Sequence, residues 1–257
     1  MDKTRTTGRT DDESDALIAL LDIADNIPGA RELRARSYEL LGIAPDAAVV
    51  DVGCGSGRAA VEMAERGARA VGIDPDERMI AVAAERWPTA DFRVADAYDL
   101  PFADGELHGY RADKVYHVLD DPSRAIGEAR RVLAPGGRIA LIGQDWDTFV
   151  IDADDAALTR TIVHARADRV PTPRVVRRSR NLLLDAGFAD VTVEAHTWIF
   201  TDAAMVPALA GLAEGARSAG AISDAQAEAW VAEQRERGRR GRMYLALPLF
   251  VTAATRR

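Results

Sequence analysis

The sequence predicts an α/β fold built on a mostly parallel sheet, and two observations carry that prediction. From residue 47 to residue 143, short apolar runs alternate with amphipathic segments of helical spacing. Residues that end helices separate them, among them Gly67, Pro88 and the Pro135-Gly136-Gly137 turn. Strands that alternate with helices in this way are typical of β–α–β units, whose strands run parallel.

The expected elements follow in chain order. Strands are predicted over residues 47–52, 69–74, 92–96, 107–111, 138–143, 191–200 and 243–254. Helices are predicted over residues 13–25, 29–42, 57–66, 76–87, 122–133, 152–169, 174–186, 202–219 and 223–238. Residues 1–12 are polar and are expected to form a disordered tail. Residues 13–257 are expected to form one domain, in which 13–42 and about 202–240 make a helical lid over the ligand-binding edge of the sheet.

Composition excludes several classes of protein. The chain has 257 residues, of which 47% are hydrophobic and 29% charged, an ordinary globular mixture. A net charge of −8 disfavours nucleic acid as a partner. Cys54 is the only cysteine, which excludes an internal disulfide, and the histidines lack close ligand spacing, so no metal site is expected.

No segment of the sequence has the features of a secretory signal or a membrane span. The first fifteen residues lack an apolar core, and the uncharged stretch 244–255 is too short to cross a bilayer as a helix. We therefore expect a cytoplasmic protein without a membrane partner, either a monomer or a homodimer.

A glycine-rich turn between the strand at 47–52 and the next helix is the strongest signal of a ligand site. It carries Asp51, Gly53, Gly55 and Gly57 at alternate positions. Glycine is needed where the backbone takes a positive φ or where a ligand touches the chain. Asp74 ends the next strand 23 residues after Asp51, where an acid accepts both hydroxyls of a ribose in nucleotide-binding folds.

The glycine spacing distinguishes between nucleoside cofactors. A dinucleotide-binding turn has the pattern G-x-G-x-x-G. Here Arg58 stands where the third glycine would be, and Asp51 would repel a pyrophosphate. A positively charged nucleoside cofactor fits this turn better than NAD.

Four motifs in order resemble a known family. They are VVDVGCGSG (49–57), VGIDPDERMI (71–80), RVADAYDLPFADGELHGY (93–110) and DDPSRAIGEARRVLAPGGRIAL (120–141). Residues 45–143 are similar to the class I S-adenosylmethionine-dependent methyltransferases of the small-molecule type, which includes ubiquinone and menaquinone methyltransferases and natural-product tailoring enzymes. The resemblance implies a Rossmann-like sheet of seven strands, mostly parallel, with the last strand antiparallel.

The resemblance also implies S-adenosylmethionine as cofactor, S-adenosylhomocysteine as product, and a set of binding residues. It places Asp51, Gly53, Gly55 and Gly57 around the methionine part and the ribose edge, and Asp74 on the ribose hydroxyls. It places Pro75 and Met79 near the adenine, Asp96 and the backbone of Ala97 on the adenine edge, and Arg111 and Ala112 beside the sulfonium.

Residues after the fourth and fifth predicted strands are candidates for the chemistry. His117 matches a histidine often found in the family and is a candidate general base for a hydroxyl acceptor, with a pKa expected near 6.5. Asp145 is the second catalytic candidate. Tyr116 and Trp146 are expected to contact the acceptor. A packing or capping role remains the alternative for each of these four residues.

The expected function is therefore methyl transfer to a small metabolite, with O-methylation in natural-product metabolism preferred. Arg111-Ala112-Asp113-Lys114 replaces the Asn/Asp-Pro-Pro-Tyr set typical of enzymes that methylate planar amide or base nitrogens. Two alternatives stay open: an RNA or protein methyltransferase, and a non-methylating cyclase or binding protein of the same fold.

Overall fold

The computed structural model describes Ile18, Ile27 and residues 29–257. The expected tail at 1–12 and all of the expected helix at 13–25 except Ile18 lie outside the described residues. The strands are β1 (Ala48–Val52), β2 (Arg69–Asp74), β3 (Asp91–Val94), β4 (Leu107–Asp113), β5 (Leu133–Gln144), β6 (Val150–Ile151), β7 (Phe188–Phe200) and β8 (Leu245–Arg256). The helices are α2 (Ala30–Leu41), α3 (Arg58–Ala64), α4 (Glu77–Arg86), α5 (Pro122–Val132), α6 (Ala156–Ala167), α7 (Val175–Asp185), α8 (Val206–Ser218) and α9 (Asp224–Arg239), with short 3₁₀ turns η1 (Tyr116–Val118) and η2 (Ala203–Met205).

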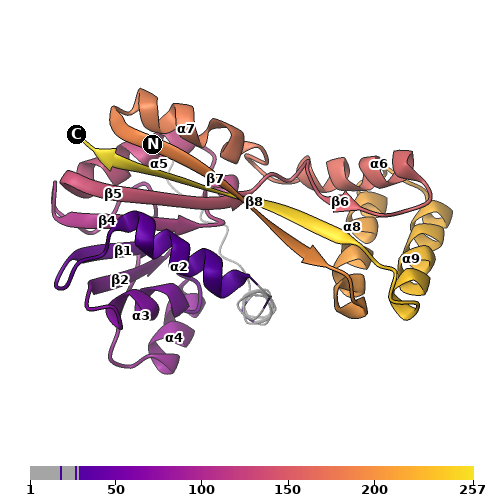
Figure 1. Ribbon diagram of the computed structural model, residues 1–257, viewed down its shortest axis with the longest axis horizontal. Helices are drawn as coiled ribbons and strands as arrows, with labels where there is room; N and C mark the ends of the chain where they lie inside the picture. Colours follow the sequence, from indigo (N-terminus) through magenta and orange to yellow (C-terminus); the bar gives the residue numbers. More distant parts are fainter. Residues whose placement is uncertain (1–17, 19–26, 28) are drawn as a thin grey trace, which may run out of the picture.

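The strands form one mixed sheet in the order β3-β2-β1-β4-β5-β8-β6, and β7 pairs with β8. Strands β1 to β5 pair in parallel, whereas β8 runs antiparallel to β5. Helices α2, α3 and α4 lie on one side of the sheet and α5 and α7 on the other (Figure 1). This confirms the predicted α/β fold with an antiparallel last strand.

The sheet has eight strands rather than the seven expected. Strand β8 continues beyond the point where its pairing with β5 ends, at Gln144↔Leu249, and β6 pairs with the continuation at Val150↔Ala246. A two-residue strand leaves no hydrophobic alternation in the sequence, which is why it was not predicted. Pro248 lies between the segment of β8 that pairs with β5 and the segment that pairs with β6. Its missing N–H therefore removes no hydrogen bond from the edge of β8 that faces β5 and β6.

Strands β7 and β8 extend from the sheet to a helical lobe made of α6, α8 and α9 (Figure 1). The lobe has a hydrophobic core of its own, in which Ile162, Leu209 and Trp230 are at most 1% exposed. The indole N–H of Trp230 donates to Thr159 Oγ1 at 3.0 Å, which joins α9 to α6. Helix α6 therefore belongs to the lobe, and nothing in its own sequence pattern indicated that it packs there.

Helix α2 is packed on the sheet rather than on the lobe. Leu33 belongs to a cluster with Leu249 and Val251 of β8, and Leu41 belongs to another with Val49 of β1. Arg36 Nε donates to Glu194 Oε2 of β7 at 2.9 Å. Motion of α2 as a lid stays a prediction, and these contacts are what such motion would have to break.

None of the helices in the described residues is long and apolar enough to cross a membrane.

The lobe core predicts a strong dependence on Trp230. Replacing Trp230 by alanine removes a fully buried side chain and its hydrogen bond, so we expect the free energy of unfolding to fall by about 3–5 kcal/mol. Chemical denaturation measures the loss. Arg235→Ala, on the exposed side of the same helix, is the control and should change stability by about 0.5 kcal/mol or less. Equal losses in both variants would contradict the assigned core.

Candidate active site

The glycine turn between β1 and α3 depends on its glycines for its own packing. Gly53, Gly55 and Gly57 have φ values of 68°, 52° and 89°, in the left-handed region that favours glycine. A Cβ on Gly53 would lie 2.3 Å from Val115 Cγ2, and one on Gly57 would lie 2.5 Å from the Phe92 ring. The turn therefore requires these glycines before any ligand is considered.

Asp74, at the end of β2, holds the glycine turn in place. One carboxylate oxygen accepts the N–H of Gly55 at 3.0 Å and the other accepts the N–H of Asp76 at 3.0 Å. Each carboxylate oxygen has two lone pairs, so accepting one backbone N–H at each oxygen does not by itself exclude a bond from a ribose hydroxyl. The sequence indicated the ribose role of Asp74 but not its contact with the turn.

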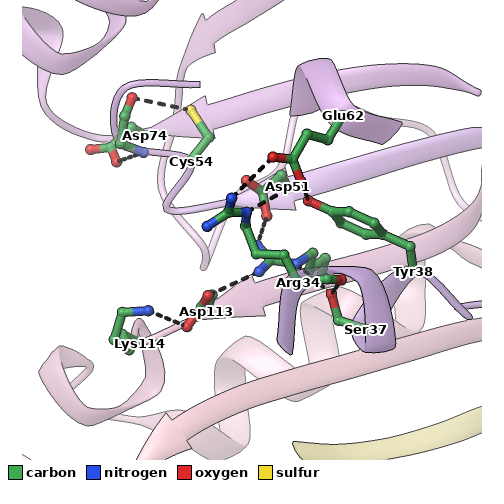
Figure 2. A network of polar contacts seen from close by, with 11 residues as sticks. Arg34, Ser37, Tyr38, Asp51, Cys54, Glu62, Asp74, Asp113 and Lys114 are labelled. Carbon is green, nitrogen blue, oxygen red and sulfur yellow. Dashed lines mark hydrogen bonds and ion pairs between the residues drawn. The ribbon is translucent and has the colours of Figure 1, made fainter. Parts of the chain in front are cut away.

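A buried ion pair joins the ends of β1 and β4. Asp51 and Arg111 are direct neighbours in the parallel ladder, and their side chains are 3% and 2% exposed. Arg111 donates to Asp51 Oδ1 at 2.8 Å, to Ser37 Oγ of α2 at 2.9 Å and to Asp113 Oδ2 at 2.9 Å. Lys114 Nζ continues the network to Asp113 Oδ1 at 2.7 Å. Figure 2 shows these contacts around the strand ends.

Helix α2 adds a second polar group beside this pair. Arg34 donates to both carboxylate oxygens of Glu62 in α3, at 3.1 and 3.2 Å, and Tyr38 Oη donates to the same carboxylate at 2.9 Å (Figure 2). Sequence reasoning missed these residues. The available signal was the spacing of Arg34, Ser37, Tyr38 and Leu41, which places all four on one face of α2.

The network determines which groups carry charge. Burial opposes the charge on Arg111, but Asp51 and Asp113 hold its pKa above the ordinary value. Burial raises the pKa of Asp51, against the opposing effect of Arg111. Burial also opposes ionisation of Asp113, yet Lys114 and Arg111 hold its pKa below the usual range. Arg111 takes Oδ1 of Asp51, so a cofactor group that contacts Asp51 would share this carboxylate with Arg111, and that contact stays a prediction.

A cavity of about 80 Å³ lies over the glycine turn and fits one end of the expected cofactor. Acids and bases both line it, namely Asp51, Asp113, Arg34, Arg58, Arg111 and Lys114. A methionine moiety carries an ammonium and a carboxylate, so a lining of both signs suits it. Lys114 is held at φ 58°, a conformation that is uncommon outside glycine and concentrated at functional sites.

The remaining expected cofactor residues lie at neighbouring strand ends. Pro75 is exposed directly after β2, and Met79 is 2% exposed in α4. Asp96 is exposed after β3 and accepts the N–H of Tyr98 at 2.9 Å, while Ala97 is buried. Ala112 is 1% exposed in β4. Their contacts with a cofactor stay predictions.

His117 and Trp146 meet at the second part of the site. His117 lies in η1 after β4, and Trp146 follows β5, with their ring centroids 5.1 Å apart. Phe149 stacks on Trp146 at 5.8 Å, and the guanidinium of Arg166 from α6 lies 4.4 Å from the Trp146 ring centre. The structure thus brings together two of the predicted residues and adds Arg166 of α6.

The environment of His117 lowers its basicity. Burial is the largest cause, and Arg166 and Lys114 add to it, so the pKa of His117 falls to about 4. The value near 6.5 expected from the sequence is therefore corrected. His117 is neutral at physiological pH and able to accept a proton.

Tyr116, expected to contact the acceptor, and Asp145, the second catalytic candidate, both have protein partners in the structure. Tyr116 is 5% exposed within the main core, and its hydroxyl pairs with Tyr110 Oη at 3.1 Å. Asp145 is 2% exposed, and its carboxylate accepts from the Arg177 guanidinium and from the N–H of Asp147. Both side chains thus help to hold η1 and the loop of Trp146, and their roles toward an acceptor stay predictions.

Cys54 is a buried thiol in the glycine turn. Burial raises the pKa of the Cys54 thiol, which keeps it protonated. In the part of the chain that the structure describes, no group of three or more metal-binding side chains is found.

Comparison with known proteins identifies the family. Residues 50–141 match the methyltransferase domain family. An uncharacterised 37.1 kDa protein of transposon TN4556 from Streptomyces fradiae is 31% identical over 247 residues, which are 92% of this chain and 70% of that protein. The 27-O-demethylrifamycin SV methyltransferase of Amycolatopsis mediterranei is 34% identical over 142 residues, and the chain spans about half of its length, 48%.

Solved structures share the fold. The YcgJ protein of Bacillus subtilis superposes with a TM-score of 0.61 at 15% identity, covering 88% of this chain and 99% of that one. Geranyl diphosphate C-methyltransferase of Streptomyces coelicolor, solved with S-adenosylhomocysteine, has a TM-score of 0.56 at 18% identity and covers 88% and 80%. The chain belongs to the class I S-adenosylmethionine-dependent methyltransferases, and its cofactor is S-adenosylmethionine.

Asp74 provides the first test of the cofactor site. Asp74→Ala removes the acceptor assigned to the ribose hydroxyls and the acceptor of the Gly55 N–H. Hydrogen bonds to a charged group contribute about 1.5–3 kcal/mol each, so we expect S-adenosylmethionine affinity to fall at least about tenfold in calorimetry. Asp91→Ala, which removes an exposed acid from the strand next to β2, is the control and should bind normally. Unchanged affinity in Asp74→Ala would contradict the assignment.

Proposed function

We propose that this methyltransferase acts on a hydroxyl oxygen of a small metabolite, in natural-product metabolism. The observation that carries the proposal is a neutral histidine, His117, beside the aromatic ring of Trp146 at the carboxyl ends of β4 and β5. Open α/β sheets bind ligands at this edge. The names of two relatives support oxygen as the acceptor, the rifamycin enzyme above and the O-methyltransferase resE of Aspergillus sclerotiorum, 36% identical over 101 residues.

The proposed cofactor site is the edge of β1, β2 and β4 described above. Asp51, Gly53, Gly55 and Gly57 with Arg111 and Ala112 would hold the methionine end, Asp74 the ribose, and Pro75, Met79, Asp96 and Ala97 the adenine. When bound, S-adenosylmethionine supplies an electrophilic methyl group on a sulfonium. Everything else that the reaction needs comes from the protein: orientation of the acceptor and removal of its proton.

His117 is proposed to take the proton of the acceptor hydroxyl on its neutral imidazole. A base with a pKa of about 4 is weaker than an ordinary histidine, and general-base catalysis is most efficient when the pKa lies near the working pH. The arrangement therefore suits an acidic hydroxyl, such as a phenol or enol, better than a simple alcohol.

His117→Ala tests this role. We expect kcat to fall by about 10²–10⁴-fold, the range for loss of a general base, with cofactor affinity and thermal stability almost unchanged. The measurement is release of S-adenosylhomocysteine with a panel of phenolic acceptors. His164→Ala, an exposed histidine on α6, is the matched control and should retain full activity. A variant that loses stability and affinity together would indicate a structural role instead.

The lowered pKa also predicts the pH profile of the parent enzyme. Burial is the main cause of the lowered pKa of His117. Among the charged groups around the ring, Arg166 and Lys114 lower this pKa and Asp113 raises it. Because the neutral imidazole is the active form, kcat/KM for a neutral acceptor should be flat across about pH 6–9 and fall only as pH approaches about 4. A rise through about pH 6.5 would contradict the buried, cation-flanked environment of His117.

A further inference from the structure

Arg166 is a half-buried cation that has no carboxylate partner among the described residues. Its guanidinium lies 4.4 Å from the centre of the Trp146 ring, and burial followed by the charge of Arg169 lowers its pKa. The two acids that flank Trp146 in the chain have other partners: Asp145 is paired with Arg177, and Asp147 is paired with Arg174 at 3.0 Å. A desolvated cation without a counter-ion is costly, so this position favours an anion.

Trp146 offers a second unsatisfied group at the same place. Its indole nitrogen is buried and has no hydrogen-bond acceptor in the described part of the chain. Buried donors in native proteins are nearly always paired, and an unpaired one costs about 1–3 kcal/mol. A ligand group with two or three oxygens would satisfy the guanidinium over the ring face with one oxygen and the indole N–H at the ring edge with another.

The elements that carry this cluster are held together. Thr172, in the segment that connects α6 to α7, donates its N–H to the carbonyl of His117 at 3.0 Å and its hydroxyl to the carbonyl of Tyr116 at 2.7 Å. These bonds tie the α6–α7 connection to η1, and the N–H of Trp146 donates to the carbonyl of Pro173 at 3.2 Å, so the same segment holds both the His117 turn and the Trp146 loop. The cluster is therefore organised before a ligand arrives.

We propose that Arg166 and Trp146 form an oxyanion subsite, and that the methyl acceptor carries a carboxylate or a phosphate group that accepts hydrogen bonds from the Arg166 guanidinium and the Trp146 indole N–H. The inference rests on the proposed function, since it specifies the substrate class of that same site. The planar guanidinium presents paired donors that match either oxyanion.

The subsite has a consequence for the base. Arg166 is one of the two cations that lower the pKa of His117. An oxyanion bound to Arg166 offsets that charge, so the pKa of His117 rises when the acceptor binds. His117 then becomes a better base in the ternary complex than in the free enzyme.

The experiment uses the full chain loaded with S-adenosylhomocysteine. Benzoate and inorganic phosphate are titrated separately by calorimetry, and histidine NMR follows the pKa of His117. We expect at least one probe to bind and to raise the pKa of His117. Arg166→Gln should weaken that binding by about 10- to 100-fold, abolish the shift, and raise the pKa of His117 in the free protein.

Two variants serve as controls. Arg160→Gln removes the same charge from the exposed side of α6 and should bind the probe like the parent. Arg166→Lys keeps the charge but loses the planar donor pair, so it should retain the His117 shift at saturating probe and bind more weakly. Binding of benzoate alone identifies a carboxylate, and binding of phosphate alone identifies a phosphate.

Absence of binding by both probes, or equal binding by the parent and Arg166→Gln, would overturn the subsite. The outcome is separable from that of the proposed function. If a probe binds in an Arg166-dependent way but no oxygen acceptor is methylated, the subsite is supported and the proposed O-methylation is rejected. If hydroxyl acceptors are methylated but no probe binds in an Arg166-dependent way, O-methylation is supported and the subsite is rejected.

Discussion

The buried ion pair between Asp51 and Arg111 is the constraint on which the site depends. Removing two charges from water costs several kcal/mol per ion, and only good geometry with full hydrogen bonding offsets that cost. Arg111 meets this condition by bonding to Asp51, Ser37 and Asp113 at once. One guanidinium thereby fixes the ends of β1 and β4 and the position of α2. The glycine turn and η1 both start from strand ends held in this way.

The two halves of the site differ in how their charges are balanced. Over the glycine turn, Arg111 and Lys114 face Asp51 and Asp113, so cations and carboxylates are matched. Near Trp146, the carboxylates of Asp145 and Asp147 are paired with Arg177 and Arg174, and Arg166 has no carboxylate partner in the part of the chain that the structure describes. The first half suits a zwitterionic cofactor end, and the second suits an anionic acceptor. His117, whose ring contacts Trp146 in the second half, follows Lys114 of the first half by three residues in the chain.

Local patterns in the sequence were sufficient for the fold and for the strand ends. Apolar alternation and glycine or proline boundaries predicted seven of the eight strands, because each signal lies within one element. The bounds agree within three residues except at β5, which begins at Leu133, five residues earlier than predicted, so that the predicted turn at 135–137 is part of the strand. Pairings between distant residues leave no such signal. Arg177 lies 32 residues from Asp145 and Arg111 lies 60 from Asp51, so the occupation of both carboxylates became visible only once the elements were packed. The membership of α6 in the lobe rests on such a distant contact too, since Trp230 lies 71 residues from Thr159.

A double-mutant cycle on Asp51 and Arg111 tests the central claim most directly. Arg111→Met leaves the Asp51 carboxylate buried and uncompensated, so the free energy of unfolding should fall by about 3–5 kcal/mol. Adding Asp51→Asn removes that charge, and the double variant should recover a large part of the loss, a coupling well above the 0.5 kcal/mol scatter of independent sites. Denaturation of the four proteins gives the result. Losses that simply add would contradict the account, because the pair would then not be the interaction that holds the strand ends together.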